Sequence, residues 1–257
     1  MGATVAVPWE PLVLWAAVTF VTPVAVALLP LSRRRIGDRT IHVMLGLSAG
    51  LLLGISLVDI LPESFALLEG GAPTLVAFGV FGGFFLLFLV EFFLLHGEGE
   101  GHHFGEGPSR KPFGPLALGA LVIHGALDGF VIPLAFSLGA APGTAVTLAI
   151  ALHQIPDSFA AVSIALAAGY DRRQSMRFVL ASAADTPLGI LLGLGFLGLG
   201  TGFLPFALAF AAGTFLFVAA VDLIPELQHR TRSPLVAAMI LAGFLAVAGL
   251  TALLPGA

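Results

Sequence analysis

His124-Gly-Ala-Leu-Asp128 and His153-Gln-Ile-Pro-Asp157 each place an aspartate four residues after a histidine, in two neighbouring stretches that are otherwise apolar. Residues four apart lie on one face of a helix, so each stretch presents an imidazole and a carboxylate side by side. A carboxylate inside a lipid bilayer is costly unless it meets a proton, a cation or water. Two such pairs in adjacent helices therefore predict a shared polar partner, for which a divalent metal ion is the simplest candidate.

The composition of the chain is that of an integral membrane protein. Of its 257 residues, 58% are hydrophobic and only 10% are charged, proportions that a soluble globular domain of this length does not show. The lipid bilayer is therefore its expected surrounding, and no nucleic-acid partner is expected. The absence of cysteine excludes disulfide bonds and thiolate metal ligands.

Apolar runs predict an all-α fold of eight transmembrane helices in a single domain over residues 1–257. Each run is roughly 20 residues long, which is enough to cross about 30 Å of hydrocarbon. The runs lie at about 11–31, 41–62, 73–95, 115–137, 143–169, 176–198, 204–228 and 233–255. The alternative for the first run is a cleaved signal peptide, but the run lacks a positively charged start and is too long for one.

The basic residues indicate one consistent orientation for these helices. All 11 fall in alternate connections, namely Arg33, Arg34, Arg35 and Arg39, then Arg110 and Lys111, then Arg172, Arg173 and Arg177, and finally Arg230 and Arg232. The positive-inside rule places these connections in the cytoplasm and both chain ends outside. We therefore expect a multi-pass protein of the plasma (inner) membrane.

The second and seventh expected helices end in the same short signature. Asp59-Ile-Leu-Pro62-Glu63 recurs as Asp222-Leu-Ile-Pro225-Glu226, five helices later and therefore at the opposite membrane face. This placement predicts an inverted repeat of helices 1–3 and 6–8 around a central hairpin of helices 4 and 5. The alternative is that both signatures are ordinary helix ends, where acids and prolines are common.

The central hairpin is expected to bring the two histidine–aspartate pairs to a similar depth. A short turn within residues 137–143 joins the two helices, which places His124 level with Asp157 and Asp128 level with His153. With a rise of about 1.5 Å per residue, both pairs lie near the middle of the bilayer. The alternative is a purely structural role, in which each histidine hydrogen-bonds the opposite aspartate without metal.

Prolines add oxygen atoms near the same depth. Pro156 and Pro187 have no N–H to donate, which frees backbone carbonyls, and irregular backbone is tolerated in a membrane where it borders a watery cavity. Gln154 and Asp185 lie close to these prolines in the sequence. We therefore expect the metal ligands to come from His124, Asp128, His153, Gln154, Asp157 and Asp185.

The connection at about 96–112 is rich in glycine, histidine and glutamate. Such a composition predicts a flexible cytoplasmic loop. His96, His102 and His103 are candidates to hold a cation loosely in this loop, and the alternative is a plain solvated linker.

These motifs resemble those of the ZIP family of divalent metal transporters, and the resemblance covers essentially the whole chain. In that family the fourth helix reads roughly His-Asn/Ser-x-x-Glu/Asp-Gly and the fifth roughly His/Gln-x-x-Pro-Glu. The residues that match these two motifs here are His124, Asp128, Gly129, His153, Pro156 and Asp157. The chain departs from the family pattern at Gly125, where Asn or Ser is usual, and in helix 6, where Asp185 lies one position before the usual Glu.

The resemblance implies uptake of a divalent cation toward the cytoplasm by alternating access, with one helical group sliding or rocking against another in a homodimer. Asp59 and Glu63 would then form the outer entrance. The inner exit would comprise Glu91, His96, His102, His103, Asp222 and Glu226. Imidazole and carboxylate ligands suit Zn²⁺, the first expectation, and also Fe²⁺, Mn²⁺ and Cd²⁺. Protonation is expected to assist release, because ligands must lose protons to bind metal.

Two other classes of function use similar residues. An intramembrane metallohydrolase would use His and Asp around an activated water, but the sequence has no HExxH motif and no separate nucleophile. A haem protein would use His124 and His153 as axial ligands, but carboxylates one turn from each histidine make a poor haem pocket. We therefore expect a protein that is not an enzyme and that carries no prosthetic group.

Overall fold

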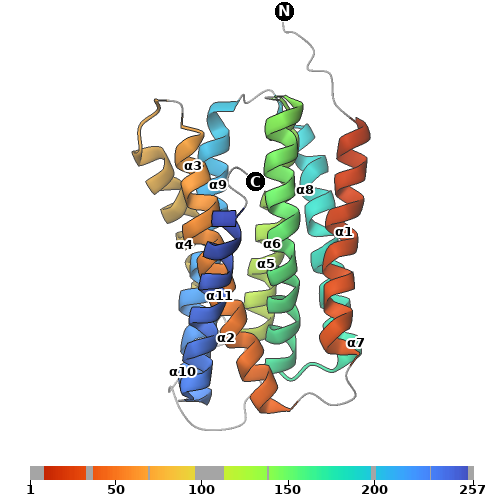
Figure 1. The fold of residues 1–257 in the computed structure, drawn as a ribbon, viewed down its shortest axis with the longest axis vertical. Helices are drawn as coiled ribbons and strands as arrows, with labels where there is room; N and C mark the ends of the chain where they lie inside the picture. The colour runs from red at the N-terminus through yellow and green to blue at the C-terminus, as the bar shows by residue number, and fades with distance from the viewer. Residues whose placement is uncertain are drawn as a thin grey trace, which may run out of the picture.

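The chain forms a bundle of helices whose axes run along one common direction (Figure 1). The structure is a computed structural model that describes residues 9–32, 37–68, 70–95, 113–137, 139–197, 201–231 and 233–253. Its α-helices are α1 (Trp9–Leu31), α2 (Asp38–Gly54), α3 (Leu61–Ala66), α4 (Thr74–Leu95), α5 (Phe113–Ser137), α6 (Ala140–Ala167), α7 (Arg172–Ala183), α8 (Asp185–Leu194), α9 (Leu204–Phe217), α10 (Ile224–Arg230) and α11 (Pro234–Leu253). Two π-helical segments, η1 (Ile55–Ile60) and η4 (Val218–Leu223), and a short 3₁₀ segment, η3 (Thr201–Phe203), complete the described elements.

The expected all-α membrane fold is confirmed. Within the described residues, eight helical segments are long and apolar enough to cross a membrane, and three of them join shorter elements. The second segment runs through α2, η1 and α3, the sixth through α7 and α8, and the seventh through α9, η4 and α10. The central hairpin turns more tightly than expected, since α6 already begins at Ala140, directly after Gly139, whose φ is positive at 136°.

The helices pack as two sets (Figure 1). In the first set, α1, α5, α6, α7 and α8 pack together. In the second, α2 packs on α11, α4 packs on α9, and the short elements η1, α3, η4 and α10 contact α2 or α9. We call these the hairpin set and the outer set. The sets meet where α6 lies against α2 and where α5 lies against α9 and η4. Both His-x-x-x-Asp motifs belong to the hairpin set.

Glycines allow the closest helix pairs within each set. A side chain at Gly129 on α5 would collide with the backbone oxygen of Thr186 on α8, and one at Gly189 would collide with the carbonyl of Ala126. Gly50 on α2 is equally close to the backbone of α11. Small residues of this kind drive helix association in membranes, where no hydrophobic effect pulls helices together. The helices that carry the polar residues are therefore held at backbone-to-backbone contact.

Two π-helical segments interrupt the second and seventh membrane segments, an irregularity that the sequence analysis did not predict. Both η1 and η4 end just before the Pro-Glu part of the repeated signature. In a π-helix the hydrogen bonds run to i+5, so one extra residue is inserted and the following side chains turn to a new face. The matching positions agree with the expected inverted repeat, which itself stays a prediction.

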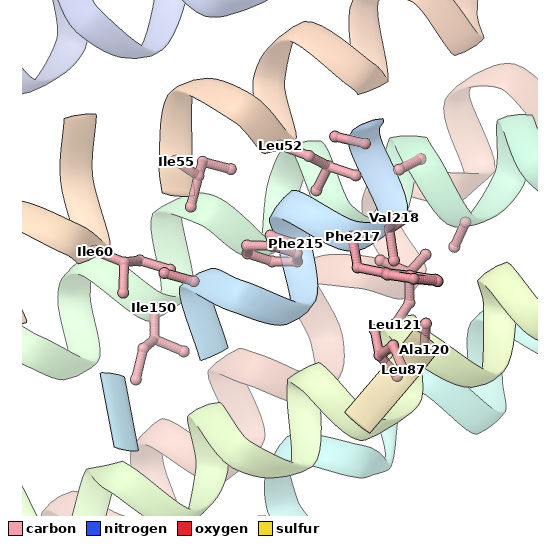
Figure 2. Packing of buried hydrophobic residues seen from close by; sticks show 14 of the residues in the cluster. Leu52, Ile55, Ile60, Leu87, Ala120, Leu121, Ile150, Phe215, Phe217 and Val218 are labelled. Carbon is pink, nitrogen blue, oxygen red and sulfur yellow. The ribbon is translucent and has the colours of Figure 1, made fainter. Parts of the chain in front are cut away.

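Apolar side chains fill the space between the two sets. Figure 2 shows Leu87, Ala120 and Leu121, from α4 and α5, gathered beside Phe217 and Val218 at the junction of α9 and η4. All five residues are buried. Large apolar side chains on α1, α4 and α11 point outward instead, as expected of surfaces that face lipid.

Candidate metal centre

The fourth and fifth membrane segments bring three ligand-bearing side chains together in the interior. One ligand atom from each of His124, Asp128 and Asp157 lies within 4.8 Å of the other two. His124 and Asp128 are 1% and 2% exposed. Two carboxylates and an imidazole this close together inside membrane segments are stable only with a proton, a cation or water among them. We call these three residues the metal triad.

Local helix geometry sets the contact between the two triad members on α5. The Nε2 atom of His124 lies 3.0 Å from Oδ2 of Asp128, which follows it by four residues. Asp157 reaches them from α6, the other arm of the hairpin. The structure therefore brings His124, Asp128 and Asp157 together, and their role as metal ligands stays a prediction. The side chain of His153 lies outside the described residues.

The other imidazole nitrogen of His124 contacts α9. Nδ1 lies 3.0 Å from the hydroxyl of Thr214 and 3.2 Å from the carbonyl oxygen of Ala211. The Thr214 hydroxyl also donates a hydrogen bond of 2.7 Å to the Ala211 carbonyl. A carbonyl oxygen can only accept, so the geometry favours a proton on Nδ1. Nε2 of His124 then faces the carboxylate of Asp128, an arrangement that a proton or a metal cation shared between them stabilises.

Asp185 occupies the space that the missing side chain at Gly125 leaves. A Cβ atom added at Gly125 would overlap the carboxylate group of Asp185, which enters from the start of α8. This carboxylate is 5% exposed and interacts electrostatically with those of Asp128 and Asp157. The two departures from the family pattern are thus one structural feature, because Asp185 fills the position that a side chain on residue 125 would take.

A break in the sixth membrane segment aims Asp185 at this position. The backbone turns at Ala184, between α7 and α8, and Pro187 on the first turn of α8 cannot donate to the carbonyl of Ala183. Thr186 donates a hydrogen bond of 3.1 Å to Oδ1 of Asp185 and accepts one of 2.8 Å from the amide of Gln154. The expected irregular backbone near Pro187 is therefore present at the depth of the metal triad.

Gln154 lies on α6, three residues before Asp157, and is 6% exposed. Its amide oxygen is buried and accepts no hydrogen bond within the described part of the chain. Because buried amide oxygens are nearly always satisfied, this atom is a candidate to bind a ligand. The structure thus joins Gln154 to Asp185 through Thr186 and brings Asp185 near Asp128 and Asp157, whereas their role as metal ligands stays a prediction.

The carboxylates expected at the two mouths form two further groups. Asp59 and Glu63, from η1 and α3, interact with each other electrostatically, and Glu63 is exposed. Asp222 interacts with Glu91 on α4 and with Glu226 on α10. Asp222 and Glu226 are buried. Of the residues expected at the exit, His96, His102 and His103 lie outside the described residues.

Four neighbours of the triad were not predicted from the sequence. Thr214 and the Ala211 carbonyl contact the His124 ring through Nδ1, Phe215 stacks on its face, and Thr186 joins Gln154 to Asp185. Threonine, phenylalanine and alanine are common in membrane helices, so no local pattern distinguishes Thr214, Phe215 or Ala211. Only Thr186 had a signal, since it lies directly between Asp185 and Pro187.

Comparison with known protein families adds independent information on this region. The model of the family described as ZIP Zinc transporter matches residues 109–251. This match covers more than half of the chain and contains the metal triad, Gln154, Asp185 and the inner acids Asp222 and Glu226. The comparison with curated proteins gave no match.

Proposed function

The chain belongs to the ZIP zinc transporter family, and from this premise we propose that the metal triad is the site through which it carries divalent transition-metal cations toward the cytoplasm. The family consists of transporters of divalent metal cations and not of enzymes, and the eight apolar segments make this member a multi-pass membrane protein. The observation that carries the proposal is the enclosure of His124, Asp128 and Asp157 within 4.8 Å of one another.

The ligand set favours borderline cations. One imidazole nitrogen and several carboxylate oxygens suit Zn²⁺, Fe²⁺, Mn²⁺ and Cd²⁺, and affinity order alone does not separate these ions. We propose Zn²⁺ as the principal cargo and the other three as further substrates. Gln154 and Asp185 would complete the coordination shell, because both present oxygen atoms beside the triad.

A route through the protein follows from the three acidic groups. Asp59 and Glu63 would attract cations at the outer mouth, the triad would bind them without most of their water, and Glu91, Asp222 and Glu226 would receive them inside. Leu87 lies one helical turn before Glu91, and Val218 one turn before Asp222. We propose that Leu87 and Val218, which Figure 2 shows gathered with Ala120, Leu121 and Phe217, belong to an apolar layer between the triad and the inner acids, and that this layer opens during passage.

The division into two helix sets supports alternating access. The triad, Gln154 and Asp185 belong to the hairpin set, whereas Asp59, Glu63, Glu91, Asp222 and Glu226 all belong to the outer set. We propose that the hairpin set moves against the outer set and so carries the bound ion from one group of acids to the other. A homodimer formed through the outer set would hold that set still during the movement.

Transport and site are tested together by uptake into proteoliposomes. We expect saturable uptake of Zn²⁺ that Fe²⁺, Mn²⁺ and Cd²⁺ inhibit in competition. His124→Ala and Asp157→Ala should each lower uptake at subsaturating metal by about 10-fold or more, because loss even of a supporting contact costs 10–100-fold in metal affinity. If each of these two variants takes up Zn²⁺ as well as the unchanged chain does, the triad is not the transport site.

The orientation of the helices is tested by introducing single cysteines and labelling them. The chain has no cysteine of its own, so every labelled thiol is the introduced one. Ala72→Cys, in a connection, and Ala140→Cys, at the first residue of α6, lie at exposed positions expected outside. Ser32→Cys and Asp171→Cys lie in exposed connections expected in the cytoplasm. In intact cells, a membrane-impermeant maleimide should label the first two and not the last two until the cells are permeabilised. The reverse labelling pattern would contradict both the orientation and the inward route.

A further inference from the structure

The imidazole of His124 is held by a helix that does not carry the metal triad. His124 lies on α5 in the hairpin set, and its ring contacts Thr214, Phe215 and the Ala211 carbonyl, all on α9 in the outer set. Thr214 and Phe215 are both 0% exposed, so no water competes for these contacts. Two of these contacts, with the Thr214 hydroxyl and the Ala211 carbonyl, are polar, and both are made by the Nδ1 atom of the ring.

The two contacts of Nδ1 together define the protonation state of the ring. The Thr214 hydroxyl gives its one proton to the Ala211 carbonyl, at 2.7 Å, and so meets Nδ1 with an oxygen lone pair. The carbonyl, 3.2 Å from Nδ1, also presents lone pairs only. Nδ1 therefore carries a proton, which leaves Nε2, 3.0 Å from Oδ2 of Asp128, as the ring nitrogen available to a metal ion.

From this geometry we propose that Thr214 is the positioning residue of the metal site, and that it orients the His124 ring and selects its metal-binding tautomer from across the boundary between the two helix sets. The inference rests on the proposed function, since it assumes that His124 binds the transported ion. Thr214 does not touch the metal. It acts through His124, whose Nε2 it directs at the carboxylates of Asp128 and Asp157.

The position of Thr214 in the outer set has a consequence for transport. When the hairpin set moves past α9, the Thr214–His124 contact breaks and the imidazole is free to rotate. Metal affinity should therefore be highest while the two sets stand as they do in this structure, and should fall once they have moved. A ligand that binds one arrangement more tightly also favours that arrangement. Thr214 thereby makes the metal affinity depend on how far the hairpin set has moved past the outer set.

The test removes only the hydroxyl. Thr214→Val keeps the shape of the side chain, and Thr214→Ser keeps the hydroxyl but not the methyl group. We expect Thr214→Val to raise the dissociation constant for Zn²⁺, measured by equilibrium dialysis on purified protein, by about 10-fold, as supporting partners of metal-bound histidines do. Thr214→Ser should stay within about 2-fold of the unchanged chain. In proteoliposomes, Thr214→Val should raise KM and leave kcat unchanged or higher.

Thr147→Val is the matched control. Thr147 is a fully buried threonine like Thr214, but it lies on α6. Its hydroxyl donates a hydrogen bond of 2.6 Å to the Gly143 carbonyl of its own helix. This variant should bind Zn²⁺ as the unchanged chain does. If Thr147→Val weakens binding as much as Thr214→Val, or if Thr214→Ser fails to restore affinity, the effect is general destabilisation and the proposal is wrong.

A measurement on the unchanged protein does not depend on how the variants fold. The ¹⁵N spectrum of histidine-labelled, metal-free protein, with the His124 signal identified by its loss in His124→Ala, should show a proton on Nδ1. A proton on Nε2 instead would overturn the proposal. Failure of the unchanged chain to bind Zn²⁺ at all would refute the proposed function, whereas normal binding by both unchanged chain and Thr214→Val would refute this inference alone.

Discussion

Asp128→Asn is expected to lower metal uptake at subsaturating concentration by at least about 100-fold, since it removes a charged ligand where supporting contacts alone are worth 10–100-fold. The substitution keeps the size of the side chain. The new amide can donate a hydrogen bond to Nε2 of His124, 3.0 Å away, so the buried imidazole keeps a polar partner and the fold is preserved. Zn²⁺ uptake into proteoliposomes, together with the melting temperature in detergent, measures the two effects separately.

The control for this variant is Asp171→Asn. Asp171 is an exposed carboxylate that caps α7 by accepting a hydrogen bond of 2.8 Å from the backbone N–H of Gln174. Asparagine caps helices as well as aspartate does, so both stability and uptake should be unchanged. If Asp128→Asn takes up as much Zn²⁺ as Asp171→Asn, the carboxylate of Asp128 is not needed for transport. The metal triad would then be the wrong site.

Gly129→Val is expected to cause the largest loss of stability. Any side chain on Gly129 collides with the backbone oxygen of Thr186, which cannot rotate away, so α8 must move from α5. Overpacking of this kind costs about 3 kcal/mol when the neighbour cannot relax, and a loss of that size lowers the melting temperature of a chain of this length by roughly 10 °C. Because α8 carries Asp185 and Thr186, uptake should fall as well.

Gly119→Val is the matched control on the same helix. A Cβ atom at Gly119 meets nothing within 4 Å, and this residue is exposed. Both substitutions change the helix propensity of α5 in the same way, so any difference between them reports the contact with α8. Thermal melting of the two purified variants compares them directly. If Gly119→Val melts as low as Gly129→Val, close packing of α5 on α8 is not the reason for the loss.

The sequence alone was sufficient to predict the membrane fold and the proximity of His124, Asp128 and Asp157. Eight apolar segments follow from composition and length, because a helix that crosses lipid must satisfy its own backbone and cover itself with apolar side chains. His124 and Asp128 lie together because helix geometry brings residues i and i+4 to one face. Asp157 joins them because a short turn determines which residues of two antiparallel helices stand level. Each of these relations is local or passes through one tight turn.

Only the tertiary structure decided what surrounds the triad. His124 and Thr214 are 90 residues apart in the chain, and no turn or periodicity relates their helices. In the sequence, Gly125 and Asp185 are two separate departures from the family pattern. The contact between α5 and α8 makes them one feature, because it places the carboxylate of Asp185 over Gly125. The reason is physical: side-chain spacing within a helix follows from its hydrogen bonds, whereas the packing of distant helices depends on how all their surfaces fit at once.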